Sequence, residues 1–156
     1  MSLRTRVISI NDFFTVIATE TIERGEIIFP LAGNIVKQPS KYSIQISDSE
    51  HLLPYSDNPE DSTSIWRFMN HSCDPNTSFD IEKMVLVAIK NINPNEEVRF
   101  NYNTTEYEMD SPFLCKCDSK NCYKEIKGFD YLSDIEKKNL KYIAPHLKKI
   151  LRSSVL

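Results

Sequence analysis

The chain has 156 residues, of which 40% are hydrophobic and 26% charged, and its formal net charge is −3. This is the size of one domain with its own hydrophobic core, and the composition excludes a disordered chain. No apolar run approaches the roughly 18 residues of a membrane-spanning helix, and the N-terminus lacks the apolar core of a signal peptide. We therefore expect an intracellular protein, cytoplasmic or nuclear, with no membrane contact.

The charge is unevenly distributed along the chain. Residues 1–123 carry 11 Lys and Arg against 18 Asp and Glu, a net charge of −7, whereas residues 124–156 carry 8 against 4, a net charge of +4. An acidic body does not suit a protein that must neutralise phosphates, so direct nucleic-acid binding is not expected. It does suit a basic protein or peptide as partner, although the same charges also fit solvated faces that only maintain solubility.

Short strands are predicted over most of the chain. Residues 6–10, 13–18, 27–29, 84–89 and 98–102 are rich in β-branched and aromatic residues or alternate between apolar and polar. Residues 47–64 are polar and contain two prolines, which predicts an irregular loop. Residues 65–69 fit either a strand or a helical turn.

Helix is predicted only near the C-terminal end. Ser133 and Glu136 form a capping-box pattern, from which a helix is expected to run to residue 143. Pro145 is expected to break it, with a second short helix over residues 147–151. Short strands followed by helices predict an α+β fold that is mostly β.

Four cysteines form the clearest candidate site. Cys115, Cys117 and Cys122 lie within eight residues of one another in a polar setting, and Cys73 is the only other thiol. Thiols stay reduced inside cells, and four thiolates are the ligands of a closed structural zinc site. Disulfides or unrelated core cysteines are the alternatives. His71 is a further ligand candidate, but a tetrahedral site of four thiolates leaves no fifth position, so a structural histidine is the default.

Three motifs then resemble those of SET-domain protein-lysine methyltransferases, in the order found in that family. Residues 67–76, Arg-Phe-Met-Asn-His-Ser-Cys-Asp-Pro-Asn, are similar to the central motif of the family. Residues 95–102, Asn-Glu-Glu-Val-Arg-Phe-Asn-Tyr, resemble its Gly-Glu-Glu-Leu-x-Phe-Asp-Tyr segment. The Cys-x-Cys-x4-Cys trio resembles the post-SET zinc motif, which takes its fourth thiolate from the Asn-His-Ser-Cys segment. With weaker matches, the resemblance covers about residues 6–130.

The resemblance implies a SET-domain fold of small curved sheets with a pseudoknot, in which the chain passes through a loop near the Asn-His segment. It divides one compact unit into a SET domain over residues 1–110, a post-SET zinc-binding segment over 111–130 and a C-terminal helical extension over 131–156. It also implies S-adenosylmethionine as methyl donor, structural Zn²⁺, and a lysine of a histone or another basic protein or peptide as substrate.

The resemblance assigns a set of residues to the cofactor. Asn70 and His71 match the pair that holds the adenine, and Tyr42 lies where the family has a cofactor-contacting tyrosine. The flanking motif, the post-SET region and the N-terminal wall complete the implied cofactor set with Arg67, Phe68, Phe113, Leu114 and Phe14.

Two further residues are implied to act in catalysis. Tyr102 matches the catalytic tyrosine, whose phenol would orient the lysine amine for in-line attack on the methyl group. Phe100 matches the position that sets how many methyl groups fit, and a phenylalanine there implies multiple methylation. An aromatic channel next to a sulfonium would also disfavour the lysine ammonium, which prevails at its usual pKa of ~10.4. By pattern alone, both residues fit a strand face packed into the core.

The chain departs from the family pattern at the N-terminal cofactor wall and at one channel wall. Phe13, Phe14 and Thr15 stand where the family has Gly-x-Gly, and Leu31 stands where it has a channel-lining tyrosine. Asn101 replaces the Asp before the catalytic tyrosine. An active lysine methyltransferase is therefore the first hypothesis, and a non-catalytic SET-like module that binds a basic peptide or protein is the second. A zinc-stabilised interaction domain without a cofactor is the third.

Overall fold

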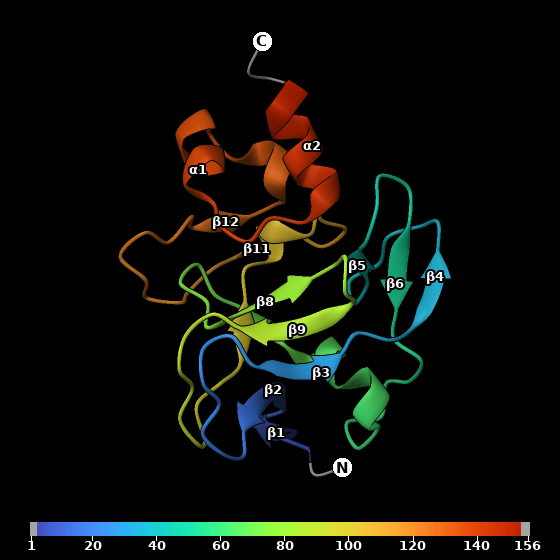
Figure 1. Ribbon diagram of the computed structural model, residues 1–156, viewed down its shortest axis with the longest axis vertical. Helices are drawn as coiled ribbons and strands as arrows, with labels where there is room; N and C mark the ends of the chain where they lie inside the picture. The colour runs from blue at the N-terminus through green and yellow to red at the C-terminus, as the bar shows by residue number, and fades with distance from the viewer. Residues whose placement is uncertain (1–2, 154–156) are drawn as a thin grey trace.

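The computed structural model describes residues 3–153 as five small sheets with two helices at one end (Figure 1). An N-terminal hairpin pairs β1 (Thr5–Ile10) with β2 (Phe13–Ala18). The central sheet has the order β3 (Ile27–Pro30), β9 (Val85–Ala88), β8 (Thr77–Asp80). A third sheet has the order β4 (Asn34–Val36), β6 (His51–Leu53), β5 (Ile44–Gln45).

Two short strand pairs and three 3-10 helices complete the body. β7 (Asn70–His71) pairs in parallel with β10 (Arg99–Phe100), and β11 (Phe113–Leu114) pairs antiparallel with β12 (Glu125–Ile126). The 3-10 helices are η1 (Ser62–Phe68), η2 (Tyr102–Thr104) and η3 (Phe129–Tyr131). The α-helices α1 (Asp134–Asn139) and α2 (Pro145–Ser153) follow. The predicted mostly-β, α+β architecture is confirmed.

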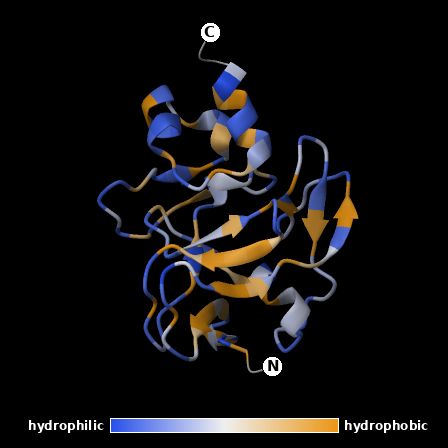
Figure 2. Cartoon of the chain, in the orientation of Figure 1, coloured by the Kyte–Doolittle hydropathy of each residue, from blue (hydrophilic) through white to orange (hydrophobic). Residues whose placement is uncertain are grey.

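The main hydrophobic core lies between the central sheet, the N-terminal hairpin and η1. β3 and β9 of the central sheet are apolar over most of their length (Figure 2). Trp66 of η1 is buried in this core, and its indole N–H donates to the carbonyl oxygen of Ala32 at 2.9 Å. This bond satisfies the one polar group of a large buried ring.

The parallel pairing of β7 with β10 joins two motif segments that lie about thirty residues apart in the chain. Asn70 is opposite Arg99, His71 is opposite Phe100, and the N–H of Ser72 donates to the carbonyl oxygen of Phe100 at 3.0 Å. This is the contact expected where the chain passes the Asn-His segment. It places the central motif directly beside the residues that precede Tyr102.

Several element boundaries differ from the sequence-based predictions. The 47–64 segment is not entirely irregular, because it contains β6 and the beginning of η1. The predicted strand 98–102 shortens to two residues because Asn101 caps η2, its side chain accepting from the N–H of Asn103 at 3.0 Å. Residues 65–69 adopt the helical turn rather than the strand.

The C-terminal extension has a small core of its own, formed by Phe129, Leu132, Leu140, Ile143 and Leu147. The predicted capping box of Ser133 and Glu136 is present. α1 nevertheless ends at residue 139, and Tyr142 adopts a left-handed φ of 58° that no helix continues through. Pro145 begins α2 instead of breaking a helix, because the first turn needs no proline N–H.

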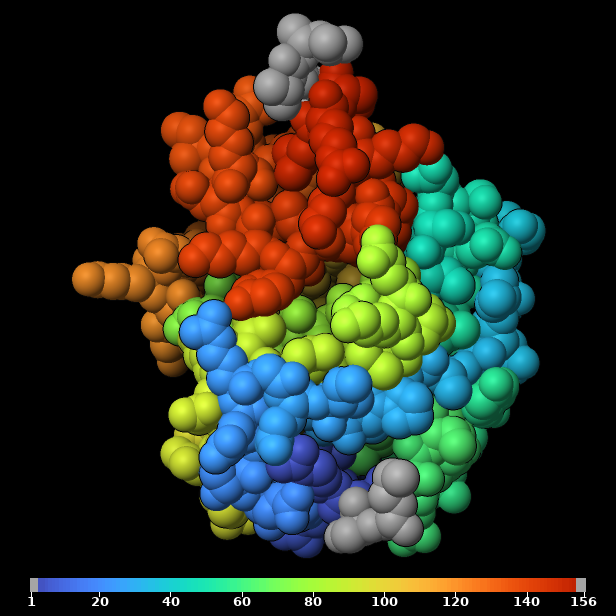
Figure 3. All heavy atoms as spheres, in the orientation of Figure 1, coloured from blue at the N-terminus to red at the C-terminus, as the bar shows by residue number. Residues whose placement is uncertain are grey.

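The C-terminal extension forms one end of the molecule (Figure 3). Hydrogen bonds join it to the rest of the chain. The N–H of Ala144 donates to the carbonyl oxygen of Thr104 at 2.8 Å. The Nε2 of His146 lies 2.7 Å from the carbonyl oxygen of Thr105. Since a carbonyl only accepts, Nε2 carries the proton, and the buried Nδ1 has no partner within residues 3–153. Burial lowers the pKa of His146, so its ring is neutral.

The docking of α2 is expected to weaken in acid. A buried histidine with a lowered pKa contributes stability above its unfolded pKa of about 6.5, and that contribution is lost as the pH falls below it. His146→Gln retains an N–H for Thr105 and cannot titrate. The midpoint of thermal unfolding should therefore fall less between about pH 7.5 and 5.5 in this variant than in the wild type. Equal decreases in both proteins would contradict this account.

Candidate functional site

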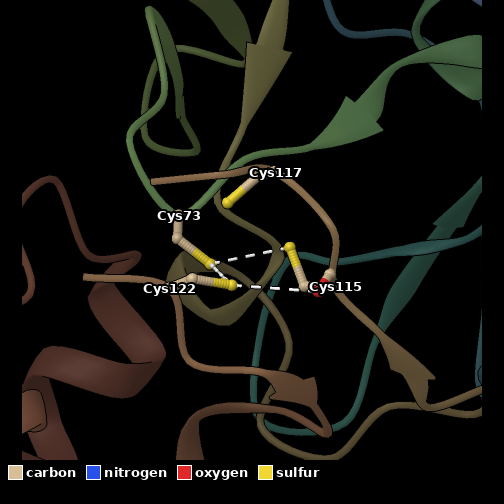
Figure 4. Close-up of side chains that lie close together, drawn as sticks. All are labelled: Cys73, Cys115, Cys117 and Cys122. Atoms are coloured by element: carbon tan, nitrogen blue, oxygen red, sulfur yellow. Dashed lines mark hydrogen bonds between the residues drawn. The ribbon is translucent and has the colours of Figure 1, made fainter. Parts of the chain in front are cut away.

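The four cysteines converge as predicted. Cys73 follows β7, and the other three follow β11, so two distant segments meet at one point (Figure 4). The four sulfur atoms lie within 4.8 Å of one another, and the Sγ of Cys73 is 3.8 Å from those of Cys115 and Cys122. A zinc ion with Zn–S bonds of ~2.3 Å holds its sulfurs about 3.8 Å apart, so the cluster fits tetrahedral zinc.

The alternatives for the cysteines do not fit. A sulfur–sulfur distance of 3.8 Å is far beyond the ~2.05 Å of a disulfide bond, and all four thiols are free. The side chains are half-buried rather than part of either apolar cluster. The surrounding segment stands out from the side of the molecule around residues 115–120 (Figure 3), so a metal is the interaction that would order it.

His71 contacts this cluster without occupying a ligand position. Its Nδ1 accepts the N–H of Tyr102 at 3.0 Å, which leaves the proton on Nε2, 3.2 Å from the Sγ of Cys73. Burial, followed by the charge of Arg99, lowers the pKa of His71 to about 3, so the ring is neutral. An N–H directed at a metal thiolate orients that ligand. His71 thus connects the cysteine cluster to the backbone of Tyr102.

A pocket lies between residues of η1 and η2 and includes Tyr102 in its lining. It is lined by Ser40, Lys41, Tyr42, Ser43, Ile44, Trp66, Arg67, Met69, Phe100, Tyr102, Glu106, Met109, Asp110 and Ser111. Four of the sequence-predicted site residues are among them. The hydroxyl of Ser40 is buried and has no hydrogen-bond partner within the described residues.

Tyr102 is fixed at the inner wall of this pocket. Its hydroxyl donates to the carbonyl oxygen of Met69 at 2.6 Å. Burial raises the pKa of Tyr102, and the charges of Glu106 and Glu97 raise it further, so the group is a neutral phenol. A phenol that donates to a backbone carbonyl still has oxygen lone pairs to accept an N–H from a ligand.

Phe100 is buried beside Tyr102. Its ring centroid lies 4.8 Å from that of Tyr102 and 4.7 Å from that of Phe79, which meets it edge-on. Phe100 packs into the main hydrophobic core, as its position on an apolar strand face predicts. It also lines the pocket, so its size limits the space there.

Aromatic and cationic side chains form a continuous row that begins at Tyr42 and Arg67 in the outer wall of the pocket and extends beyond its lining. The guanidinium of Arg67 lies 3.9 Å from the ring centroid of Tyr42 and 5.0 Å from that of Phe68. The ring of Phe14 packs against Phe68 at 5.1 Å between centroids. Four of the predicted cofactor residues are thus brought together, and Tyr42 and Phe14 remain exposed enough to meet a ligand.

The substitutions in the N-terminal wall are accommodated without filling the site. Phe13 is 78% exposed at the end of the hairpin, so its ring points to solvent. The hydroxyl of Thr15 donates to Glu97, which also accepts the side-chain N–H of Asn70 at 3.0 Å. Asn70 in turn donates to the carbonyl oxygen of Phe14 at 3.1 Å. The hairpin is therefore fastened to β7 by this network.

Of the remaining residues considered in the sequence, Phe113 borders the site, whereas Leu114 and Leu31 do not. The ring of Phe113 lies 5.8 Å from both His71 and Tyr102, so it borders the site. Leu114, its neighbour, is 72% exposed and contributes to neither wall. Leu31, at the position of the family's channel tyrosine, is buried in the main core instead of the pocket.

Sequence reasoning missed Glu106, whose carboxyl group lines the pocket four residues after Tyr102. A four-residue separation places two side chains on one face of a helical turn, and this signal was available. The predicted strand over 98–102 hid it, because η2 is visible only once Asn101 is seen to cap it.

The chain belongs to the SET domain family. The SET domain family model matches residues 14–103, which include Tyr102 and most of the residues that line the pocket. The similar proteins include "Histone-lysine N-methyltransferase, H3 lysine-36 specific" of Candida albicans, 30% identical over 131 residues. The "Histone-lysine N-methyltransferase set9" of Schizosaccharomyces pombe is 28% identical over 145 residues. "Probable histone-lysine N-methyltransferase set-23" of Caenorhabditis briggsae is 26% identical over 132 residues.

These matches cover 74%, 84% and 71% of this chain, but only 15%, 32% and 55% of the respective relatives. The chain thus spans about half or less of the length of the relatives it matches. Among solved structures, KRYPTONITE in complex with DNA, an H3(1–15) peptide and SAH has a TM-score of 0.59 at 23% identity. The methyltransferase domain of human SETMAR has a TM-score of 0.59 at 21% identity. They cover 80% of this chain and 30% and 58% of those chains, and they confirm the predicted SET-domain fold.

Within residues 3–153, no helix has the length and apolar character that crossing a membrane requires.

We expect purified protein to contain one zinc ion per chain, bound by the four cysteines. Removing it with a chelator should expose the backbone amides of residues 113–126 to hydrogen exchange, because the ion joins this segment to Cys73. Elemental analysis and hydrogen-exchange mass spectrometry measure these two effects.

Cys117→Ser should lose most of the zinc, whereas Lys116→Ser, at the exposed position between two ligands, should retain it. If zinc-free wild-type protein showed the same hydrogen-exchange pattern as the zinc-loaded protein, the assignment of these four cysteines as zinc ligands would be contradicted.

Proposed function

We propose that this protein is an S-adenosylmethionine-dependent protein-lysine N-methyltransferase. The observation that carries the proposal is the position of the Tyr102 phenol. It is held against the Met69 carbonyl, next to Phe100, in a pocket lined mostly by residues of the family match. The relatives named as histone-lysine methyltransferases support the same reaction.

The residues around the pocket fit the proposed cofactor. Arg67 and Lys41 offer positive charge to a carboxylate, and the exposed rings of Tyr42 and Phe14 offer apolar surface to a sulfonium and an adenine. Asn70 and His71 on β7, with Phe113 beside them, complete the proposed site. When bound, the cofactor supplies an electrophilic methyl group.

Tyr102 would orient the incoming lysine amine. With its proton committed to Met69, the phenolic oxygen accepts an amine N–H, which turns the nitrogen lone pair toward the methyl group. The raised pKa keeps the phenol neutral, so the tyrosine acts by hydrogen bonding and does not take the proton. Phe100 would border the space around the amine and permit more than one methyl group.

The proposed substrate is a lysine of a basic protein or peptide, with histones as the first class to test. The acidic body of the chain supports a basic partner by electrostatic steering. A SET-fold neighbour has been solved with both an H3 peptide and DNA, so a nucleic-acid contact belongs in the same binding experiments. A histone substrate would place the protein in the nucleus.

A non-catalytic peptide-binding module is the second candidate, and the residues at positions 13 and 15 favour it. Phe13 and Thr15 carry side chains where the family brings glycine backbone to the cofactor. Calorimetric titration with S-adenosylmethionine separates the two candidates. Heat of binding supports the enzyme, and its absence at millimolar cofactor with zinc bound supports the module.

Tyr102→Phe should lower the turnover number by about a hundred-fold or more, because it removes a preorganised hydrogen-bonding group that acts in the transition state. Cofactor affinity should change little, since the phenol contacts Met69 rather than the outer wall. Mass spectrometry on histone mixtures measures the first effect and calorimetry the second. Tyr107→Phe, exposed and outside the pocket, is the matched control. A fully active Tyr102→Phe protein would contradict the proposed role.

Phe100→Tyr should keep the first methyl transfer and lose the later ones. The added hydroxyl, with any water that it binds, occupies space that a methylated amine needs beside Tyr102. Intact-mass analysis of a lysine peptide should then show a shift from multiply methylated to monomethylated product. An unchanged distribution of products would mean that Phe100 does not limit this space.

A further inference from the structure

Glu106 is a carboxyl group in the pocket that the proposed roles above leave unused. It follows η2, and its backbone N–H donates to the carbonyl oxygen of Tyr102 at 3.0 Å, one helical turn back. Both side chains line the same pocket, together with Phe100 and Met69. The charge of Glu106 also raises the pKa of Tyr102.

The carboxyl group is rigidly positioned. Its Oε2 accepts the N–H of Gln45 at 3.0 Å and the hydroxyl of Thr105 at 2.6 Å. Its carbonyl oxygen accepts the N–H of Phe129 at 2.8 Å, and α2 holds the preceding residue through His146.

The backbone at Tyr107 and Glu108, next to Glu106, packs closely against Gly128. Gly128 has a φ of 119°, and a Cβ there would lie 2.5 Å from the carbonyl oxygen of Tyr107. The segment that carries Glu106 is therefore fixed from both sides.

No cation neutralises this carboxyl group within residues 3–153. None of the ion pairs involves Glu106, although seven others are formed. The other charged or titratable groups that line the pocket or face its segment are Lys41, Tyr42, Arg67, Tyr102, Asp110 and His146. The basic ones, Lys41 and Arg67, do not pair with it, and Arg67 is stacked on Tyr42 instead. A buried carboxylate without a cationic partner is costly unless a ligand supplies the positive charge.

We propose that Glu106 binds the ammonium group of the substrate lysine and accepts its proton before methyl transfer. This inference rests on the proposed methyltransferase function and assigns to this chain a residue that its motifs do not contain. The pocket supports it because the carboxylate, Tyr102 and Phe100 surround one space: the first attracts the cation, and the second orients the amine.

The step balances without any other reactant. An ammonium N–H bond breaks, the proton moves to the Glu106 carboxylate, and the freed lone pair forms the bond to the methyl carbon. The sulfur–carbon bond breaks, its electron pair remains on sulfur, and the acid returns its proton to water. The product is again a protonated methylamine, so the same step can precede each further methylation. Burial raises the pKa of Glu106 to about 7, which suits a proton acceptor near neutral pH.

The first test compares pH profiles. In the wild type, kcat/KM for a lysine peptide should fall as the pH drops through about 7, because the carboxylate must be ionised, and should be level above it. Glu106→Gln keeps the shape but cannot accept the proton. It should lower kcat by about a hundred-fold at neutral pH, and its kcat/KM should keep rising toward the lysine pKa of ~10.4.

Glu108→Gln removes the same charge two residues away, at an exposed site bonded to Tyr131, and should leave rate and profile unchanged. Affinity for S-adenosylmethionine should be the same in all three proteins. The inference is overturned if Glu106→Gln retains the wild-type profile. It is also overturned if the variant loses cofactor affinity in step with activity, because the carboxylate would then serve the ammonium group of the cofactor.

The second test does not depend on turnover. n-Butylammonium, which mimics the end of a lysine side chain, should raise the thermal unfolding midpoint of the wild type and of Glu108→Gln, whereas neutral n-butanol should not. Glu106→Gln should lose this stabilisation. Wild-type protein that shows this pattern but transfers no methyl group would refute the proposed function and leave the ammonium site standing. Active protein with equal responses in all variants would refute only the inference.

Discussion

The parallel pairing of β7 with β10 is the interaction on which the rest of the site depends. Two residues from each strand join segments far apart in the chain, and the central motif and Tyr102 are positioned from this junction. The strand β7 carries Asn70 and His71 and leads into Cys73, while β10 carries Phe100 and leads into η2 with Tyr102 and Glu106. Such a short ladder is weak by itself, so the surrounding contacts must maintain it.

Those contacts connect the junction to three separate parts of the molecule. His71 uses one ring nitrogen for the N–H of Tyr102 and the other for Cys73, so the cysteine cluster and the pocket share a single neutral ring. Glu97 fastens the N-terminal hairpin through Thr15 and Asn70. The extension supports η2 from the opposite side through His146. Zinc at the cysteines would therefore act on the pocket as well as on the protruding segment.

The distribution of charge in the pocket follows from the same arrangement. Basic and aromatic side chains stand on its outer wall, where Arg67 is stacked between two rings. The carboxyl group of Glu106, which forms no ion pair among residues 3–153, stands with Tyr102 on the inner wall. A zwitterionic cofactor and a cationic lysine would then approach complementary groups. Thr15 donates to Glu97 and Phe13 points to solvent, so neither side chain that replaces a family glycine lines the pocket.

The sequence by itself determined the fold class, the capping box at Ser133, the cysteine cluster and the neighbourhood of the central motif, because these depend on local patterns and on ligand chemistry. It did not determine the lengths of the helices, since Tyr142 turns left-handed and Pro145 starts a helix only within the packed extension. Local alternation predicted a longer strand at Tyr102, but capping by Asn101 ends it and exposes Glu106 to the pocket. Only the tertiary structure could decide that a carboxyl group lacks a cation, because pairing is set by distances between segments rather than by residue order.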